Sequence, residues 1–473
     1  MMMLNLRSIL TVGLALNMIL TACAPARQVS LPIPTAMQSA LPPATPIPTL
    51  EPVDAGVPAI EYVGGLSKLL IISSVTGKPL DGFPSIALES YDSYAYSPDG
   101  KTLAVVSSAQ LYLIDLPSWK YTTTDIGLHG PISPVIYSPD ATLLAFAGGF
   151  PSGDLVIVDA QSGEVKTSVQ VGFSIRDIKF TVDGKAVMVY GPQLASEGIA
   201  ANAGVSAGAP KAALYAISDL SLLWSVDLTG IRDGVFPKKA NTANTQDVYQ
   251  PGAAWRYEPG IAFAPNDDIL YLVHGDQDKL TTVDFSDRKV KTVDVHAKTT
   301  WLDRLLALSA GVAYAKGMDG TVKQAVISPD GKFLFVAGNT EEVTQQANGS
   351  DWDITDTPTG LQVIAAEDGT LVDRISTGVS SVRLSPDGKQ VYLTTWNNET
   401  SWTDVYDISS RSVIKHLDGV YLTPTRTLNG EVILASNRWV STYVNYITLI
   451  DPDTWSTVGE WKSTGDVGWL DAP

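Results

Sequence analysis

Residues with the types and spacing for catalysis are few in this chain. Glu258, Arg256 and His296 are candidates, by position only, for a general base and the cationic groups beside it. No phosphate-binding loop stands out in the sequence. The sequence therefore offers candidates for catalysis, but no pattern in it identifies a catalytic residue.

Metal-binding patterns are equally sparse. The carboxylates of Asp351, Asp353 and Asp356 are oxygen ligands of the kind that Ca²⁺ prefers. Their segment, Asp-Trp-Asp-Ile-Thr-Asp, lacks the spacing and the glycine of an EF-hand loop. The four histidines lie in different repeats of the chain, at His129, His274, His296 and His416. We therefore expect no zinc and no cofactor, and we keep the three aspartates as calcium candidates.

Aromatic and charged residues gather in the long connections between predicted strands. Aromatic rings beside charged groups suit stacking on a sugar ring or anchoring a protein partner. The predicted binding-face residues are Arg232, Tyr249, Trp255, Arg256, Tyr257, Trp301, Trp352, Trp402 and Trp439. The alternative for each tryptophan is that it covers the small core of its own loop.

One turn motif recurs through most of the chain and sets its organisation. The copies are YSPDGKTLAVV at Tyr96, YSPDATLLAFA at Tyr137, FTVDGKAVMVY at Phe180, FAPNDDILYLV at Phe263, ISPDGKFLFVA at Ile327, LSPDGKQVYLT at Leu384 and a degenerate TLNGEVILAS at Thr427. Proline fixes φ, aspartate bonds to nearby backbone amides and glycine accepts positive φ, so each copy is a tight turn between two strands. A second hairpin follows each turn, and four strands per unit predict an all-β fold, a β-propeller of four-stranded blades.

The blade number depends on the two ends of the propeller. Residues 59–83 read as three strands without an innermost one. STGDVGWLDAP from Ser463 parallels STGVSSVRLSPDG from Ser376, where an innermost strand is expected. Joined, the two ends complete one more blade, so we predict eight blades closed by both termini. The alternative is seven blades, with the end segments as edge decoration or with the weak final repeat miscounted.

Several segments resemble known propeller families. SPDGKQVYLTTWNN and TDVYDISSRSVIKHL are similar to the YVTN repeat, and SPDGKTLAVV is equally similar to TolB-type and WD-repeat-like propellers. The resemblance covers most of residues 60–473 and implies the fold, but it says little of function, since the shared motifs form turns and strands. Such families include surface-layer and periplasmic binding proteins, lactonases and quinoproteins. YAISDLSLLWSV from Tyr215 and IAAEDGTLV from Ile364 faintly resemble hairpins of pyrroloquinoline quinone enzymes, without a recognisable set of cofactor ligands.

The four long connections fall on one face of the predicted propeller. In a four-stranded meander the turn motifs occupy one face, and the connections between second and third strands and between blades occupy the other. The long connections are residues 191–211, 229–260, 296–321 and 339–360. Long loops in a compact domain are often functional, so we expect this face to be the binding surface.

The N-terminal segment has the features of an exported, lipid-anchored protein. Arg7 and the apolar run at residues 9–20 are typical of a secretory leader, and Leu-Thr-Ala-Cys at residues 20–23 resembles a bacterial lipoprotein lipobox. The resemblance implies a signal peptide over residues 1–22 and a lipidated Cys23, which is the sole cysteine. Residues 24–58 hold nine prolines and no aromatic residue, so 23–58 is expected to be a lipidated linker and 59–473 the propeller.

The net charge of −18 argues against nucleic acid as a partner. Together, these features predict a membrane-anchored protein of the bacterial cell envelope that faces outside the cytoplasm. Its propeller face would hold a glycan, peptide or protein partner. The alternative is a lactonase-like or quinoprotein-like enzyme.

Overall fold

The computed structural model describes most of residues 55–471. The gaps are residues 64–65, 89–92, 108, 128–133, 149–152, 196–203, 238–253, 298–319, 346–351, 376–377, 397–400, 420, 442–443 and 464–465. The described residues belong to one compact unit, Pro52–Pro473. The expected leader, Cys23 and most of the linker lie outside them. Within the described ranges every regular element is a strand, and no helix there is long and apolar enough to span a bilayer.

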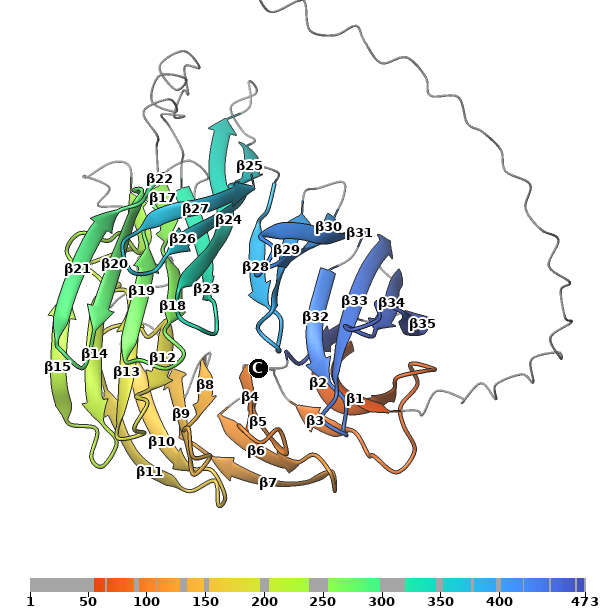
Figure 1. The fold of residues 1–473 in the computed structure, drawn as a ribbon. Helices are drawn as coiled ribbons and strands as arrows, with labels where there is room; N and C mark the ends of the chain where they lie inside the picture. Colours follow the sequence, from red (N-terminus) through yellow and green to blue (C-terminus); the bar gives the residue numbers. More distant parts are fainter. Residues whose placement is uncertain are drawn as a thin grey trace, which may run out of the picture. The chain divides into compact units, whose positions relative to one another are not determined.

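The strands form eight sheets arranged as a ring (Figure 1), and seven of the sheets are four-stranded blades. Six of these run consecutively along the chain: β4 (Ser93–Tyr96), β5 (Thr102–Ser107), β6 (Gln110–Asp115), β7 (Lys120–Asp125); β8 (Val135–Tyr137), β9 (Leu143–Gly148), β10 (Asp154–Asp159), β11 (Val165–Gln170); β12 (Asp177–Phe180), β13 (Ala186–Gly191), β14 (Lys211–Ala216), β15 (Leu222–Asp227); β18 (Gly260–Phe263), β19 (Ile269–Val273), β20 (Lys279–Asp284), β21 (Lys289–Asp294); β28 (Ser381–Leu384), β29 (Gln390–Trp396), β30 (Ser401–Asp407), β31 (Ser412–Asp418); β32 (Tyr421–Arg426), β33 (Val432–Ser441), β34 (Val444–Ile450), β35 (Thr457–Ser463).

The seventh four-stranded blade, called here the closing blade, joins the two ends of the propeller. It contains β36 (Asp466–Trp469), β1 (Gly56–Val63), β2 (Leu66–Ser73) and β3 (Ile86–Leu88). β36 pairs antiparallel with β1, with Ala59 opposite Trp469, so the predicted closure by both termini is confirmed. β1 begins at Gly56, slightly before the expected boundary at residue 59, because Val57 is already buried in the core.

The eighth sheet is larger. Its central strands β23 (Gly320–Ile327), β24 (Phe333–Gln345), β26 (Leu361–Ala365) and β27 (Thr370–Ile375) keep the blade order, and β16 (Gly234–Pro237), β17 (Ala254–Glu258), β25 (Trp352–Pro358) and β22 (His296–Ala297) are added to them. The predicted alternative of seven therefore matches the number of regular four-stranded blades. The prediction of eight four-stranded blades was wrong, because the remaining sheet has eight strands and not four.

The turn motif has the hydrogen bonds that its residues predicted. In the first copy, Ser97 Oγ donates to Asp99 Oδ1 at 2.7 Å, and Asp99 Oδ1 accepts from the Lys101 amide at 3.1 Å. Gly100 has a φ of +69°, which is the conformation that favours glycine. In the second copy Ala141 occupies the matching position with a φ of +60°.

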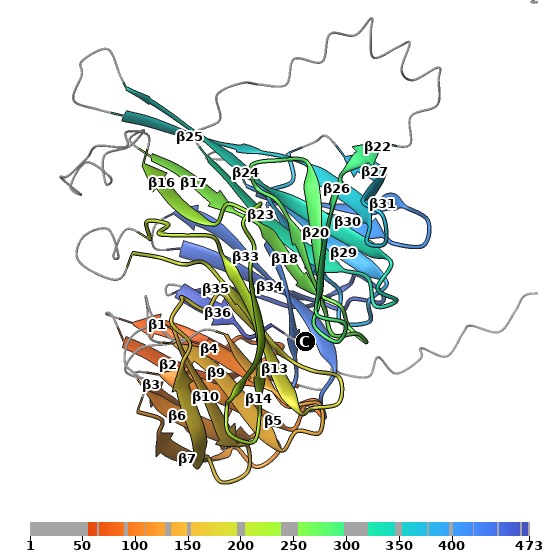
Figure 2. The ribbon, with the colours of Figure 1, turned by 90° about the vertical axis from the view of Figure 1, so that its left-hand side faces the viewer.

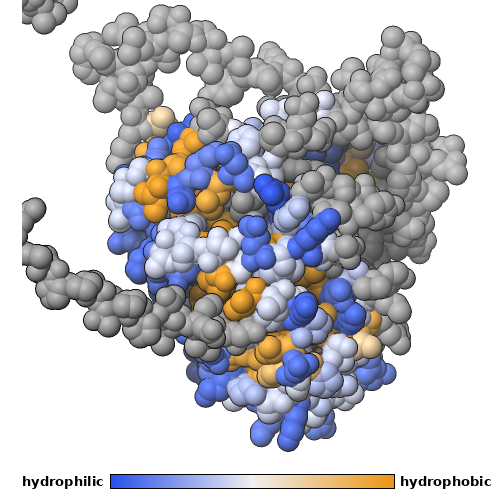
Figure 3. Space-filling view, turned by 90° about the vertical axis from the view of Figure 1, so that its right-hand side faces the viewer, coloured by the Kyte–Doolittle hydropathy of each residue, from blue (hydrophilic) through white to orange (hydrophobic). Residues whose placement is uncertain are grey.

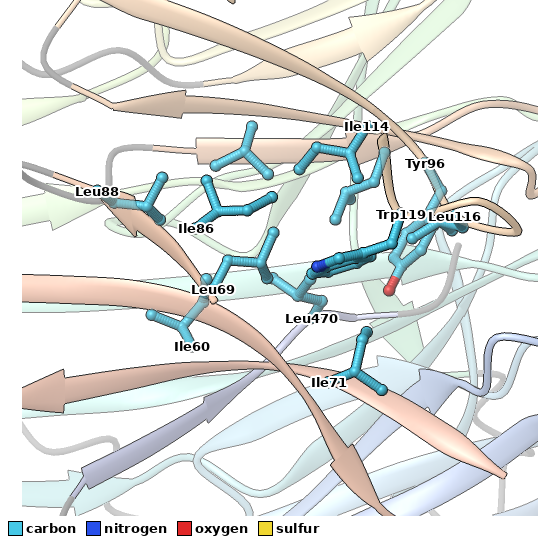
Figure 4. Close-up of a cluster of buried hydrophobic side chains, with 12 residues drawn as sticks. Ile60, Leu69, Ile71, Ile86, Leu88, Tyr96, Ile114, Leu116, Trp119 and Leu470 are labelled. Carbon is cyan, nitrogen blue, oxygen red and sulfur yellow. The ribbon is translucent and has the colours of Figure 1, made fainter. Parts of the chain in front are cut away.

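The apolar core lies between adjacent blades. Figure 4 shows one such cluster, in which Ile60 and Ile71 of the closing blade pack near Ile114 and Trp119 of the β4–β7 blade. Leu470, directly after β36, is fully buried in the same cluster. Each blade is thus stabilised by its neighbours, and the ring leaves no unpaired blade at its ends.

Outermost strands carry most of the exposed apolar side chains. Leu222 and Leu223 on β15 and Val413 and Ile414 on β31 are examples. On the side of the ring shown in Figure 3, apolar residues form patches that are separated by hydrophilic ones.

Candidate binding site at the centre of the ring

The structure joins the four long connections to one another. In the 191–211 connection, Leu194 bridges Ser206, and Val205 bridges Val235 of β16. β16 pairs with β17, and β17 runs parallel to the start of β23. β24 extends beyond its blade and pairs with β25 (Figure 2). We call β16, β17, β25 and the adjoining parts of β23 and β24 the insertion sheet.

A close backbone approach holds the insertion sheet against its blade. Arg256 of β17 lies opposite Gly320 of β23. A Cβ atom on Gly320 would lie 2.4 Å from the Arg256 carbonyl oxygen, so only glycine fits there without a shift. The parallel pairing of two strands from different connections therefore depends on this residue type.

Arg176, just before the innermost strand β12, connects its blade to the insertion sheet. Its Nη2 atom lies 2.7 Å from Asp233 Oδ1, and its Nη1 atom lies 2.7 Å from Glu258 Oε2. Tyr190 donates its hydroxyl hydrogen to Asp233 Oδ2 at 2.8 Å. Arg256 donates from Nε and Nη2 to Glu258 Oε1, at 2.8 and 2.6 Å. Four chain segments are thus fixed by one network of charged hydrogen bonds.

Burial sets the protonation of this network. Asp233 has no exposed surface, and its burial raises its pKa to about 6 although Arg176 and Tyr190 favour the ionised form. Burial also acts to raise the pKa of Glu258, but Arg176 and Arg256 outweigh it and lower that pKa. Glu258 is therefore held as a carboxylate between two guanidinium groups, which makes it a poor proton acceptor.

A stack of aromatic and cationic side chains lies beside this network. The guanidinium carbon of Arg232 is 5.5 Å from the ring centroid of Phe236 and 5.4 Å from that of Tyr257. The two rings are 5.9 Å apart. Trp255 is half-buried on the same strand as Tyr257. This arrangement offers aromatic surface next to charge, as the sequence predicted for residues 229–260.

The turn after β19 covers the network from the next blade. His274 is buried, its Nε2 atom lies 2.8 Å from Thr281 Oγ1, and burial lowers its pKa to about 4. A Cβ atom on Gly275 would lie 2.9 Å from the Thr321 carbonyl oxygen. Asp276 Oδ2 lies 3.5 Å from Arg232 Nε. The turn is therefore packed directly on β23 and tied to the aromatic stack.

A cavity of about 330 Å³ opens among the innermost strands beside this network. We call it the central cavity, and its lining residues are Arg176, Glu258, Pro259, Ile261, Lys323, Gln324, Ala325 and Val382. Most of these residues lie on or directly before β12, β18, β23 and β28, the innermost strands, which face the centre of the ring (Figure 1). Glu258 ends β17, and Pro259 directly follows it.

Lys323 differs from the arginines near the cavity because it has no ion-pair partner among the described residues. Burial lowers its pKa, against the opposite effect of Asp278 and Asp276. Next to it in sequence, Gln324 accepts a hydrogen bond at Oε1 from Ser381 Oγ at 2.9 Å. The amide group of Gln324 is thereby held at the cavity wall.

The structure brings together four of the predicted binding-face residues: Arg232, Trp255, Arg256 and Tyr257 all belong to the insertion sheet or its approach. Trp402 lies on β30 and its ring is 6.4 Å from His416 of the same blade. Trp352 and Trp439 lie in β25 and β33, and their side chains are outside the described set. Tyr249 and Trp301 lie outside the described residues altogether.

The three catalytic candidates do not converge. Glu258 and Arg256 lie on β17, but His296 lies on β22, at the opposite edge of the same sheet. Five strand spacings separate β17 from β22, which is about 24 Å. His296 is exposed and its Nδ1 atom lies 2.9 Å from the Asp294 carbonyl oxygen.

The calcium candidates are only partly described. Asp351 lies outside the described residues, and the side chain of Asp353 is not described. Asp356 is exposed on β25. Within the described ranges no group of three or more carboxylate, histidine or cysteine side chains is arranged to hold a metal ion.

Sequence reasoning missed the residues that organise the centre. Arg176, Asp233 and Lys323 were not singled out. A signal was available for Arg176 and Lys323, because each is a charged residue at or beside a segment predicted as an innermost strand, next to the central channel of a propeller. Asp233 belongs to Ile-Arg-Asp-Gly, but nothing in that segment indicates which partner would meet its carboxylate.

Comparison with protein-family models finds no match for this chain. No curated protein matches it either. Among solved structures it is similar to one titled "Crystal structure of the eukaryotic initiation factor", with 12% identity and a TM-score of 0.46 over 88% of this chain and 98% of that chain. A similarity at this level carries no argument, and the propeller assignment stands on the strand order described above.

Proposed function

We propose that this protein is a binding module whose propeller presents the insertion sheet and the central cavity to a ligand outside the cytoplasm. The observation that carries the proposal is the assembly of the four long connections into one bonded structure beside the cavity. A regular blade needs only short turns. Connections that pair with one another and carry buried charge therefore form a built surface rather than excess loop length.

Binding accounts for the arrangement better than catalysis does. Glu258 is neutralised by two arginines, and His296 is about 24 Å away by strand count. A general base needs an available proton-accepting atom near the reacting group, and neither residue meets that need at the cavity. The aromatic stack of Arg232, Phe236 and Tyr257 offers instead a surface for a sugar ring or a partner side chain.

The location of the protein is part of the same proposal. The leader and the lipobox-like Leu-Thr-Ala-Cys support a lipid anchor on Cys23, and the proline-rich linker would hold the propeller away from the bilayer. The partner would then be a glycan, peptide or protein of the cell envelope, with no cofactor required for its capture.

Capture experiments with the full lipidated chain test the proposal. We would compare wild type with Arg232→Ala/Tyr257→Ala in pull-downs from solubilised envelope and on a glycan panel. Arg411→Ala is the matched control, because Arg411 stacks on Phe333 at 5.2 Å but lies at a turn between β30 and β31. We expect saturable capture that the double variant loses and the control keeps. Capture that is equal in all three proteins would contradict the assignment of this face.

A further inference from the structure

We infer that the central cavity binds the carboxylate of an acidic sugar unit, with Lys323 as the cation that pairs with it. The inference deepens the proposed function, on which it rests, by naming the class of ligand group.

The other charges at the cavity are already compensated. Arg176 pairs with Asp233 and Glu258, both at 2.7 Å, and Arg256 pairs with Glu258. Lys323 lies within the influence of Asp276 and Asp278, but no described carboxylate reaches it at ion-pair distance. A half-buried ammonium group without a paired anion is a place where a ligand carboxylate gains a charge-assisted hydrogen bond.

The packing of β23 holds Lys323 in place. Lys323 lies opposite Gly338 of β24, where a Cβ atom would come within 2.0 Å of the Val322 carbonyl oxygen. The next residues on the same side of β23, Ala325 and Ile327, pack into the core shared with the β18–β21 blade. The lysine therefore projects from a fixed strand and not from a loop.

The rest of the lining suits a small hydroxylated ring. Gln324 is oriented by Ser381, so its amide nitrogen remains to donate, while the Glu258 carboxylate can accept from hydroxyl groups. Pro259, Ile261 and Val382 supply apolar walls for the carbon face of a ring. A volume of about 330 Å³ is at the lower end of the range for ligand pockets, which fits one sugar unit better than a protein surface.

Calorimetry on the full chain with simple probes tests the inference. The probes are glucuronate, glucose as its neutral counterpart, and acetate as a carboxylate without a sugar ring, each up to about 10 mM. We expect glucuronate to bind with an affinity at least about 10-fold above that of glucose or acetate. If glucose binds as tightly as glucuronate, the cavity does not recognise the carboxylate. If acetate binds as tightly as glucuronate, the cavity does not recognise the sugar ring. No binding of glucuronate would overturn the inference.

Variants assign the carboxylate contact to Lys323. Lys323→Met keeps the length of the side chain without the charge, and it should weaken glucuronate binding by about 10- to 100-fold. Lys389→Met is the matched control, because Lys389 is exposed, pairs with Asp387 and lies in the turn between β28 and β29, outside the cavity lining. Lys323→Met should unfold at no lower temperature than wild type, since it removes a half-buried charge that has no paired anion among the described residues. Unchanged glucuronate affinity in Lys323→Met would overturn the role of this lysine.

The two proposals fail in different ways. If envelope capture depends on the insertion sheet while glucuronate does not bind, the carboxylate inference is wrong and the binding function stands. If glucuronate binds through Lys323 while envelope capture is unchanged in Arg232→Ala/Tyr257→Ala, the insertion sheet is not the binding surface, and only the assignment of the cavity stands.

Discussion

Replacing Arg176 by methionine tests whether one buried ion pair controls the pH dependence of the centre. Arg176 is 27% exposed, and Asp233, its partner at 2.7 Å, is fully buried. Methionine keeps much of the apolar stem of the arginine and removes its charge. Asp233 then has only the Tyr190 hydroxyl as a described partner.

The size of the effect follows from the protonation of Asp233. An aspartate in the unfolded chain has a pKa of about 3.9, and in the folded protein the pKa of Asp233 is raised to about 6. Folding therefore favours proton uptake between these values, so the contribution of this group to stability falls as the pH rises from about 4 to 6 and then stays constant. Holding the ionised form at pH 7.5 costs about 3 kcal/mol.

Without Arg176 the pKa of Asp233 rises further, and the carboxyl takes up a proton on folding even at pH 7.5. That costs about 5 kcal/mol at pH 7.5, so the substitution adds about 2 kcal/mol there from this group. At pH 5 Asp233 is mainly protonated with or without Arg176, and the added cost is close to zero. Loss of the contact with Glu258 and of packing is common to both pH values.

Thermal unfolding at pH 5 and pH 7.5 measures the difference. For a unit of about 420 residues, 2 kcal/mol corresponds to a change in Tm of about 2 °C. We expect the Tm loss in Arg176→Met to be about 2 °C larger at pH 7.5 than at pH 5. In the double variant Arg176→Met/Asp233→Asn this side chain no longer titrates, so the extra loss at pH 7.5 should disappear. An equal loss in the single variant at both pH values would refute the reasoning about Asp233.

Three further substitutions test other parts of the fold. Ala141→Gly should raise the free energy of unfolding by up to about 1 kcal/mol in denaturant titrations, because Ala141 has a φ of +60°; a destabilised variant would contradict this. Gly320→Ala should separate β17 from β23, since its Cβ would lie 2.4 Å from the Arg256 carbonyl oxygen, and should speed amide exchange in residues 254–258; unchanged exchange would mean that the strands tolerate the methyl group. Trp469→Phe removes the indole N–H that donates to Asn437 Oδ1 at 2.7 Å, and it should lower the free energy of unfolding by about 1 kcal/mol. An unchanged denaturation midpoint would mean that this bond does not stabilise the closing blade.

Local chemistry explains why the fold could be predicted. The serine, aspartate and glycine of each turn motif are within five residues of one another, and they form their hydrogen bonds within the turn itself. The closing blade could be predicted because the segment from Ser463 matches an innermost strand in its own residues. The repeat also predicts which face the long connections occupy, since this depends only on strand order.

The centre could not be predicted in the same way. Arg176 meets Asp233 and Glu258, which follow it by more than fifty residues in a connection whose path no local pattern defines. The enlarged sheet likewise depends on a parallel pairing between β17 and β23, and parallel partners are distant in sequence by nature. Aromatic content drew attention to residues 229–260, but not to the charges that fix this connection.

The added strands change what a propeller of this type can offer. Innermost strands of a regular blade are short and closely surrounded, so the positions available for recognition at the ring centre are few. Here Glu258 of the insertion sheet and Asp233, directly before β16, compensate Arg176, and Lys323 of β23 has no described anion as a partner. Because a half-buried charge without a paired anion is costly in the absence of a ligand, the presence of Lys323 beside an open cavity favours recognition as the reason for the whole arrangement.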